Sequence, residues 1–308
     1  MKQNAFGAQV GYTNSLIGKL EKDERLPDID AVRTKFVHVL GVNGTPDGFK
    51  LIDLAINAHL ADKPAPNGDY TLRIAAPFNK FVGRRKEMES LTATLARFRL
   101  VTLCGPGGCG KTRLAGETAQ SLRDTTRVNE VWFIDLSGCR EPSDVVHEIA
   151  PSLHVGLKSS DPLSSIARFF AQREALMVID NAEHIILDVA AATDRLLRAC
   201  LTLRVLVTSR EPLRLNGEYV WRLSPLNLPQ PAEADTLDGD VLRQFEAVEL
   251  FIERARLIAP SAGDYNDAVL REIARICRRL DGLPLAIELA AAQTPKMTVH
   301  EILQHMDN

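Results

Sequence analysis

Short apolar runs separated by amphipathic segments organise residues 78–231, and this pattern predicts a parallel sheet with crossover helices. The apolar runs predict buried strands at residues 100–104, 131–136, 175–180, 203–208 and 219–226. Helical patterns follow residue 110, span 145–153 and 163–172, and lead up to Cys200. The predicted fold class of this region is therefore α/β.

The pattern on either side of this region is helical. Short helices are predicted near the start of the chain, at residues 5–10, 14–22, 29–40 and 48–60. Further helices are predicted after the sheet, at residues 241–258, 267–280, 285–293 and 299–306. A stretch with several prolines and glycines reads as a linker. The predicted domains are a small all-α domain at 1–60, a linker at 61–77, an α/β domain at 78–231 and a helical domain at 232–308.

The composition is that of an ordinary globular protein, with 45% hydrophobic and 25% charged residues among 308. The net charge of −3 gives no overall attraction to nucleic acid or to an anionic membrane. Five cysteines are scattered without a C-x-x-C pair, so neither a disulfide framework nor a zinc site is indicated. No signal peptide and no membrane-length apolar run is present, and we expect a cytoplasmic protein without a membrane partner.

The strand at 100–104 leads into a glycine-rich loop with the phosphate-loop spacing G-x-x-x-x-G-K-[ST]. Glycines let successive backbone N–H groups converge on phosphate oxygens, and the following helix presents its positive end to the same anion. Lys111 would reach the β- and γ-phosphates, and the Thr112 hydroxyl would ligate Mg²⁺. The predicted nucleotide-binding residues of this loop are Gly105, Pro106, Gly107, Gly108, Cys109, Gly110, Lys111, Thr112 and Arg113. The alternative, an ordinary glycine-rich turn, would bind nothing.

The apolar run at 175–180 ends in Asp180, as in a Walker B strand. Its carboxylate would lie beside the phosphates and hold Mg²⁺ through water, together with Thr112. The alternative is an acid that merely ends a core strand. The next residue is Asn181, whose amide cannot accept a proton, and the nearest carboxylate is Glu183. This arrangement predicts a slow ATPase that works as a switch.

Two later segments contain further candidate nucleotide-binding residues. The strand at 203–208 is followed by Arg210, a cation that can sense the γ-phosphate unless it is simply solvated. In the helical domain, Gly282 can stop one helix and Pro284 can open the next. The segment Gly-Leu-Pro-Leu-Ala around Pro284 also matches a GLPL motif.

Taken in order, these motifs resemble the nucleotide-binding region of STAND ATPases, in particular bacterial regulators of the AfsR and LuxR-ATPase type. The resemblance covers residues 78–308 and includes the hhGRE-like residues Phe81, Val82, Gly83 and Arg84, with Arg85 where the family usually has Glu. It implies that the apolar pair flanks adenine, that Arg210 is the sensor arginine and that Pro284 touches nucleotide from a helical lid. It further implies an ATP/ADP switch in transcriptional regulation, with self-assembly on activation.

Residues 5–42 resemble part of a Cro-type (XRE) helix-turn-helix, with Gly11 at the turn. The resemblance implies that operator DNA would be contacted by Thr13, Asn14, Ser15 and Lys19. Only four residues precede Ala5, where the family's first helix should lie, so we expect weak DNA binding. The alternative is a small helical bundle that binds no DNA by itself.

Full-length relatives continue into a winged helix and a helical-repeat sensor, so the sequence is expected to be a fragment. The inducer, the operator and the oligomeric state are not indicated by any motif. Two other readings stay open at this point: a DNA-binding repressor whose phosphate loop only binds nucleotide, and a metabolic P-loop enzyme.

Overall fold

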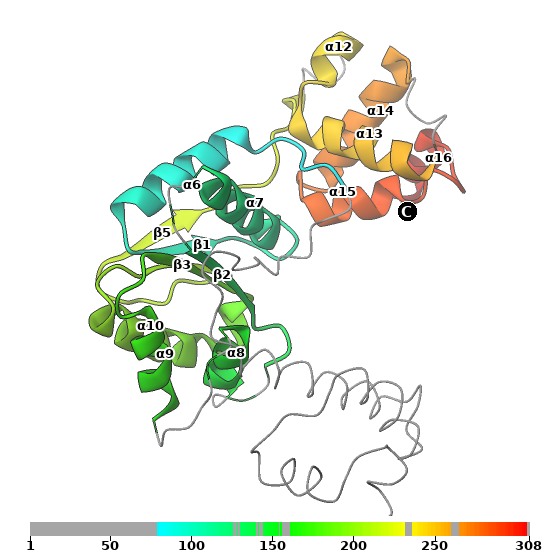
Figure 1. The fold of residues 1–308 in the computed structure, drawn as a ribbon. Helices are drawn as coiled ribbons and strands as arrows, with labels where there is room; N and C mark the ends of the chain where they lie inside the picture. The colour runs from blue at the N-terminus through cyan, green and yellow to red at the C-terminus, as the bar shows by residue number, and fades with distance from the viewer. Residues whose placement is uncertain are drawn as a thin grey trace, which may run out of the picture. The chain divides into compact units, whose positions relative to one another are not determined.

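The computed structural model describes residues 79–306, apart from residues 126, 127, 129, 140, 142, 143, 154, 156–160, 232–235 and 260–264 (Figure 1). The described residues of Tyr70–Ile149 and Ile166–Asn308 form one compact unit, and both the sheet and the C-terminal helices belong to it. The predicted helix-turn-helix and linker lie outside the described residues.

The sheet of the described region is parallel throughout and has the strand order β2-β3-β4-β1-β5. Its strands are β1 (Leu100–Cys104), β2 (Glu130–Asp135), β3 (Ala175–Asp180), β4 (Arg204–Ser209) and β5 (Glu218–Arg222). All residues of β1 and β3 are buried, as their largely apolar sequences predict for central parallel strands. Because β4 lies between β1 and β3, the ends of these three strands share one edge of the sheet.

Helices cover the two faces of the sheet (Figure 1). The helical segments of this region are α6 (Arg85–Arg97), α7 (Lys111–Asp124), α8 (Asp144–Ser152), α9 (Pro162–Phe170), the 3₁₀ helix η2 (Ala182–Ile185) and α10 (Ile186–Ala199). α7 contacts four strands, β1 to β4, whereas α10 contacts β4 from the opposite face. The α/β prediction is confirmed, and most predicted boundaries fall within two residues of the observed ones.

The C-terminal helices form a bundle, here called the lid, with a hydrophobic core of its own. Its helices are α12 (Gly239–Leu242), α13 (Glu246–Ile258), α14 (Asp267–Arg279), α15 (Pro284–Ala291) and α16 (Val299–His305). The prediction of one helix over 241–258 was wrong, because the chain breaks at Phe245, whose backbone is extended. Leu242 and Phe251 are both fully buried, and a continuous helix would place them on opposite faces.

The turn between α14 and α15 requires glycine at position 282. Gly282 has a φ of +65°, and an added Cβ would lie 2.6 Å from the carbonyl oxygen of Leu226. The Leu226 amide in turn donates to the Gly282 carbonyl oxygen at 2.9 Å. Val82 and Leu226 also belong to the hydrophobic core of the lid, so the segments before α6 and after β5 join the lid to the sheet.

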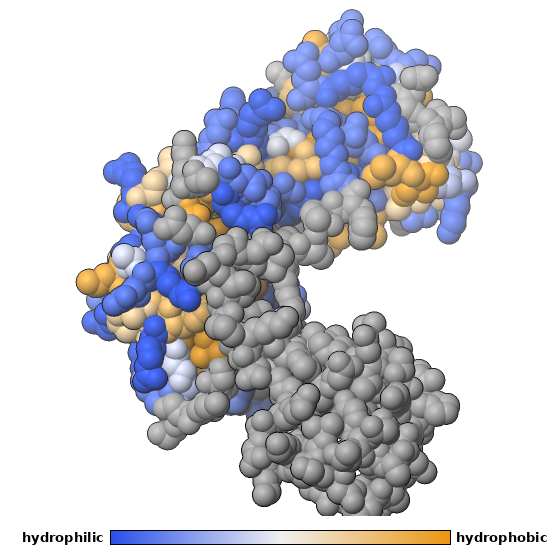
Figure 2. All heavy atoms as spheres, viewed as in Figure 1, coloured by the Kyte–Doolittle hydropathy of each residue, from blue (hydrophilic) through white to orange (hydrophobic). Residues whose placement is uncertain are grey.

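Hydrophilic residues cover most of the described surface on the face shown in Figure 2, with hydrophobic residues in smaller patches. The described helices include none that is long and apolar enough to span a membrane.

Candidate functional site

A cavity of about 900 Å³ lies between the glycine-rich loop, the segment before α6 and the lid. Twelve of the residues predicted from the sequence line it: Phe81, Val82, Arg84, Gly107, Gly108, Cys109, Gly110, Lys111, Thr112, Arg113, Arg210 and Pro284. Glu183 lines it as well. The lining does not include the predicted residues Gly83, Gly105, Pro106 and Asp180.

The loop between β1 and α7 has the conformation that its glycines allow. Gly110 precedes the first turn of α7 with a φ of 94°, and the N-terminal end of this helix faces the cavity. Lys111 is 8% exposed, and its ammonium donates hydrogen bonds to the carbonyl oxygens of Gly105 at 2.9 Å and Pro106 at 3.1 Å. The loop therefore holds a positive charge and a helix N-terminus at one point, which is an environment for phosphate.

Asp180 lies directly behind this loop and is 1% exposed. Its two carboxylate oxygens accept hydrogen bonds from the Thr112 hydroxyl, both at 2.9 Å, and one of them also accepts from Thr208. Burial raises the pKa of the Asp180 carboxyl above its ordinary value, while the hydrogen bonds from Thr208 and Thr112 act in the opposite direction. The Thr112 hydroxyl, which lines the cavity, and the Asp180 carboxylate that it contacts are hard oxygen ligands, so this pair fits Mg²⁺.

The chain turns immediately after β3, and this turn decides where Glu183 points. Asn181 takes a left-handed conformation with a φ of 61°, and η2 begins at the next residue. Glu183 thereby lines the cavity, where its Oε1 lies 3.1 Å from Nε of Arg210. The Arg210 side chain is 66% exposed and the Glu183 side chain 24%. Of the four residues predicted to be catalytic, Lys111, Asp180, Glu183 and Arg210, the last two therefore form an ion pair in the lining of the cavity.

Arg84 connects three parts of the site. Its guanidinium donates to the carbonyl oxygen of Ser224 at 2.7 Å and to that of Cys109, in the phosphate loop, at 3.4 Å. Its backbone amide donates to the carboxylate of Glu246, the first residue of α13, at 2.7 Å. The side chain is 4% exposed, so Arg84 fixes the loop to the segment after β5.

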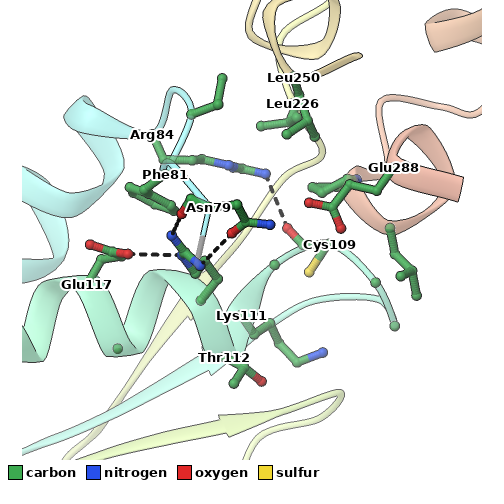
Figure 3. Close-up of a pocket in the computed structure, with 18 of the residues that line it drawn as sticks. Asn79, Phe81, Arg84, Cys109, Lys111, Thr112, Glu117, Leu226, Leu250 and Glu288 are labelled. Atoms are coloured by element: carbon green, nitrogen blue, oxygen red, sulfur yellow. Dashed lines mark hydrogen bonds and ion pairs between the residues drawn. The ribbon is translucent and has the colours of Figure 1, made fainter. Parts of the chain in front are cut away.

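A second set of contacts surrounds Arg113, another residue of the lining, and its partners Asn79, Phe81 and Glu117 are labelled in Figure 3. Its guanidinium donates to the backbone oxygen of Asn79 at 2.7 Å and to the side-chain oxygen at 3.2 Å. It also pairs with Glu117 at 2.9 Å and lies 5.6 Å from the centre of the Phe81 ring. These contacts attach the segment before α6 to the first turns of α7.

The lid contacts the phosphate loop directly through the start of α15. The Leu285 amide donates to the Gly108 carbonyl oxygen at 3.1 Å. A Cβ added at Gly110 would lie 3.8 Å from Cγ of Pro284, in ordinary van der Waals contact. Pro284 occupies the first turn of α15, as the Gly282–Pro284 pattern predicts.

Several cavity-lining residues were not found by sequence reasoning. They are Asn79, Gly116, Glu117, Gln120, Asn181, Leu226, Leu250, Arg254, Leu285 and Glu288. A signal was available for Glu288, which lies one helical turn after Pro284 and therefore on the same face of α15. The predicted DNA-facing residues Thr13, Asn14, Ser15 and Lys19 lie outside the described residues.

The sequence is similar to known proteins. A family model described as an AAA domain matches residues 97–215. A protein of Mycobacterium tuberculosis (strain ATCC 25618 / H37Rv), named "Putative HTH-type transcriptional regulator Rv0890c", is 40% identical over 225 residues. This match covers 71% of the chain and 23% of that protein, so the chain spans about a quarter of this relative's length.

Two solved structures are similar at low identity. The Walker-type ATPase PABY2304 of Pyrococcus abyssi has a TM-score of 0.48 at 15% identity, over 77% of this chain and 74% of that one. The STAND protein PH0952 of Pyrococcus horikoshii, which has a tetratricopeptide repeat sensor, has a TM-score of 0.46 at 17% identity, over 73% and 32%. The parallel sheet, the phosphate loop and the family model together define a P-loop NTPase domain similar to AAA domains.

Proposed function

We propose that this chain binds ATP and ADP together with Mg²⁺ in the cavity between the phosphate loop and the lid, and acts as a nucleotide-dependent switch. The observation that carries the proposal is the contact of α15 with the loop, where the Leu285 amide donates to the Gly108 carbonyl oxygen and Pro284 lies near Gly110. A ligand that occupies the loop must lie against both the sheet domain and the lid. Its phosphates can therefore change how firmly the two are held together.

The residues have separate tasks in this proposal. Lys111 leaves the loop carbonyls and donates to the β- and γ-phosphates, and the backbone amides of the loop surround the same oxygens. Thr112 and Asp180 hold Mg²⁺, which when bound would neutralise phosphate charge. Arg210 lies beside Gly107, since a Cβ there would be 3.4 Å from its Nη2. This proximity to the glycine-rich loop supports the proposal that Arg210 reports the γ-phosphate.

Hydrolysis is proposed to be slow. The residue after Asp180 is Asn181, and its amide donates to Asp180 and to Asp135 instead of accepting a proton. Glu183 faces the cavity, but its Oε1 is held by Arg210. A general base typically contributes about 10²–10⁴-fold to the rate. Glu183 would have to break its ion pair with Arg210 before it could accept a proton, so hydrolysis should be slow. Slow hydrolysis prolongs the ATP-bound state, as a switch requires.

We further propose that the switch serves transcriptional regulation, supported by the name of the mycobacterial relative and by the helix-turn-helix resemblance of residues 5–42. Residues 1–70 carry 8 Lys and Arg against 9 Asp and Glu, which offers phosphates little attraction. Operator binding through Thr13, Asn14, Ser15 and Lys19 is therefore proposed to be weak. Tight operator-specific binding by this chain at physiological salt would contradict that part.

Steady-state hydrolysis tests the switch directly. Wild type should turn over far less than once per second, and Asn181→Glu should raise the rate by placing a carboxylate next to Asp180. Glu183→Gln should lower the residual rate while leaving ADP binding unchanged. Wild-type turnover of many per second, unaffected by Glu183→Gln, would refute both the slow switch and the role of Glu183.

A further inference from the structure

A carboxylate of the lid lines the cavity, and the proposed phosphate binding gives it no role. Figure 3 shows Glu288 pointing from α15 toward the cavity that it lines. Its side chain is 36% exposed, and its Oε1 accepts a hydrogen bond from Nε of Arg254 at 2.8 Å. In the described part of the chain, no side chain donates to its other oxygen, Oε2. One oxygen of Glu288 is therefore free to accept a hydrogen bond from a ligand.

Arg254 holds this carboxylate in place. Its side chain is 11% exposed, and it also donates to the backbone oxygen of Lys80 at 3.3 Å. Because Arg254 belongs to α13 and Glu288 to α15, the pair joins two lid helices at the cavity wall. A buried guanidinium with two partners has few alternative positions, so the direction of the Glu288 carboxylate is fixed before any ligand binds.

The residues one helical turn before Arg254 and Glu288 indicate which part of the cavity this pair occupies. Pro284, which lies near Gly110 of the phosphate loop, precedes Glu288 by one turn, or about 6 Å along α15. Leu250 precedes Arg254 by one turn of α13 and, with Val82, forms an apolar part of the lining. The pair thus lies between the phosphate end of the cavity and the apolar end, where a base would be buried.

A carboxylate at this place needs a hydrogen-bond donor, since a phosphate oxygen would repel it. The part of a nucleotide that lies between phosphates and base is the ribose, and its 2′- and 3′-hydroxyls are donors. An acidic side chain on ribose hydroxyls is a recurrent solution in nucleotide sites of other folds. Building on the proposed nucleotide binding, we propose that Glu288, positioned by Arg254, accepts hydrogen bonds from the ribose hydroxyls and makes the site selective for ribonucleotides.

The test is calorimetric titration of wild type and Glu288→Ala with ADP, 2′-deoxy-ADP and 3′-deoxy-ADP. A hydrogen bond to a charged group is worth about ten-fold to a hundred-fold in affinity. Wild type should prefer ADP over at least one deoxy form by this factor. Glu288→Ala should bind ADP only as tightly as wild type binds that deoxy form. Its affinity for the deoxy form itself should equal that of wild type. If Glu288→Ala does not fold, Glu288→Gln keeps the volume and should still reduce the preference.

A matched control is Glu253→Ala, which removes an acid of the same lid that pairs with Arg256 at 3.6 Å and does not line the cavity. It should keep the full ribose preference. Arg254→Lys should retain part of the preference and Arg254→Ala should lose it.

The outcomes separate this inference from the proposed function. Equal weakening of ADP and both deoxy forms in Glu288→Ala would show a purely structural ion pair and overturn the inference. A changed preference between ADP and inosine diphosphate, with no change for the deoxy forms, would assign Glu288 to the base and overturn it as well. In both cases Lys111→Ala would still weaken ADP binding. If wild type binds no ADP, or Lys111→Ala binds it equally well, the proposed function fails and the inference fails with it.

Discussion

The guanidinium of Arg210 and the carboxylate of Glu183 lie 3.1 Å apart, although one follows β4 and the other lies on η2 after β3. The second oxygen of Glu183 is buried without a hydrogen-bond partner among the described residues. Arg210 thus neutralises the nearest candidate base while its own side chain stays two-thirds exposed. A γ-phosphate would offer Arg210 a more highly charged partner than Glu183 does.

Replacement of Arg210 should therefore weaken the binding of ATP more than the binding of ADP. We expect Arg210→Ala to bind ADP within about two-fold of wild type but ATP about ten-fold more weakly, since one charge-assisted hydrogen bond to the γ-phosphate is lost. Arg214→Ala is a suitable control, because Arg214 is an exposed arginine nearby that pairs with Glu211 and does not line the cavity. Competition titrations with both nucleotides measure this, and an equal loss for ATP and ADP would show that Arg210 does not sense the γ-phosphate.

The contact between loop and lid should depend on the absence of a side chain at Gly108. Gly108 has a φ of +74°, and an added Cβ would lie 3.0 Å from Cβ of Leu285. Left-handed backbone costs an alanine about 1–2 kcal/mol, so Gly108→Ala should weaken ADP binding by about ten-fold or more.

Gly138→Ala is the matched control for this variant, because no atom lies within 4 Å of the added Cβ. Its ADP affinity and thermal midpoint should stay close to those of wild type. If both alanine variants bind ADP equally well by calorimetry, contact of the loop with the lid is not required for binding.

The buried thiol next to the phosphate loop should be unreactive in the folded protein. Burial raises the pKa of Cys104 from 9.0 to about 11, so at pH 8 its thiolate fraction is roughly a hundred-fold smaller than that of a free cysteine. The unfolded chain loses this proton first, so Cys104 lowers the free energy of unfolding as the pH rises from about 9 to about 11. Peptide-resolved alkylation at pH 8 should label Cys104 only after unfolding. Rapid labelling of the native protein at pH 8 would contradict the burial of this thiol.

The parts of the site that are continuous in sequence could be predicted, because local patterns encode them. The apolar run that ends at Asp180 and the glycines before Lys111 each specify a strand end or a loop without help from distant residues. Gly282 and Pro284 likewise predict the end of α14 and the start of α15. These predictions needed only backbone preferences and the burial of parallel strands.

The direction of Glu183 and the lid side of the cavity could not be predicted in this way. Alternation along a strand would turn Glu183 away from the loop, and only the left-handed backbone of Asn181 brings it into the cavity. Asn79 and Glu288 line the same cavity, although they are more than 200 residues apart in the sequence. Their proximity depends on how the lid packs against the sheet, which is a tertiary property that no local spacing encodes.

The central claim is that the glycine-rich loop binds nucleotide, and calorimetry of Mg-ADP binding to wild type and to Lys111→Ala tests it most directly. In the proposed function Lys111 donates a charged hydrogen bond to the phosphates, and loss of such a bond costs about 1.5–3 kcal/mol, so the variant should bind at least about ten-fold more weakly. Lys80→Ala, which removes a lysine that is 63% exposed and pairs with Glu249, should bind as wild type does. Saturable binding that weakens only in Lys111→Ala is the predicted result. Equal affinity of wild type and Lys111→Ala, or no binding by either, would contradict the account.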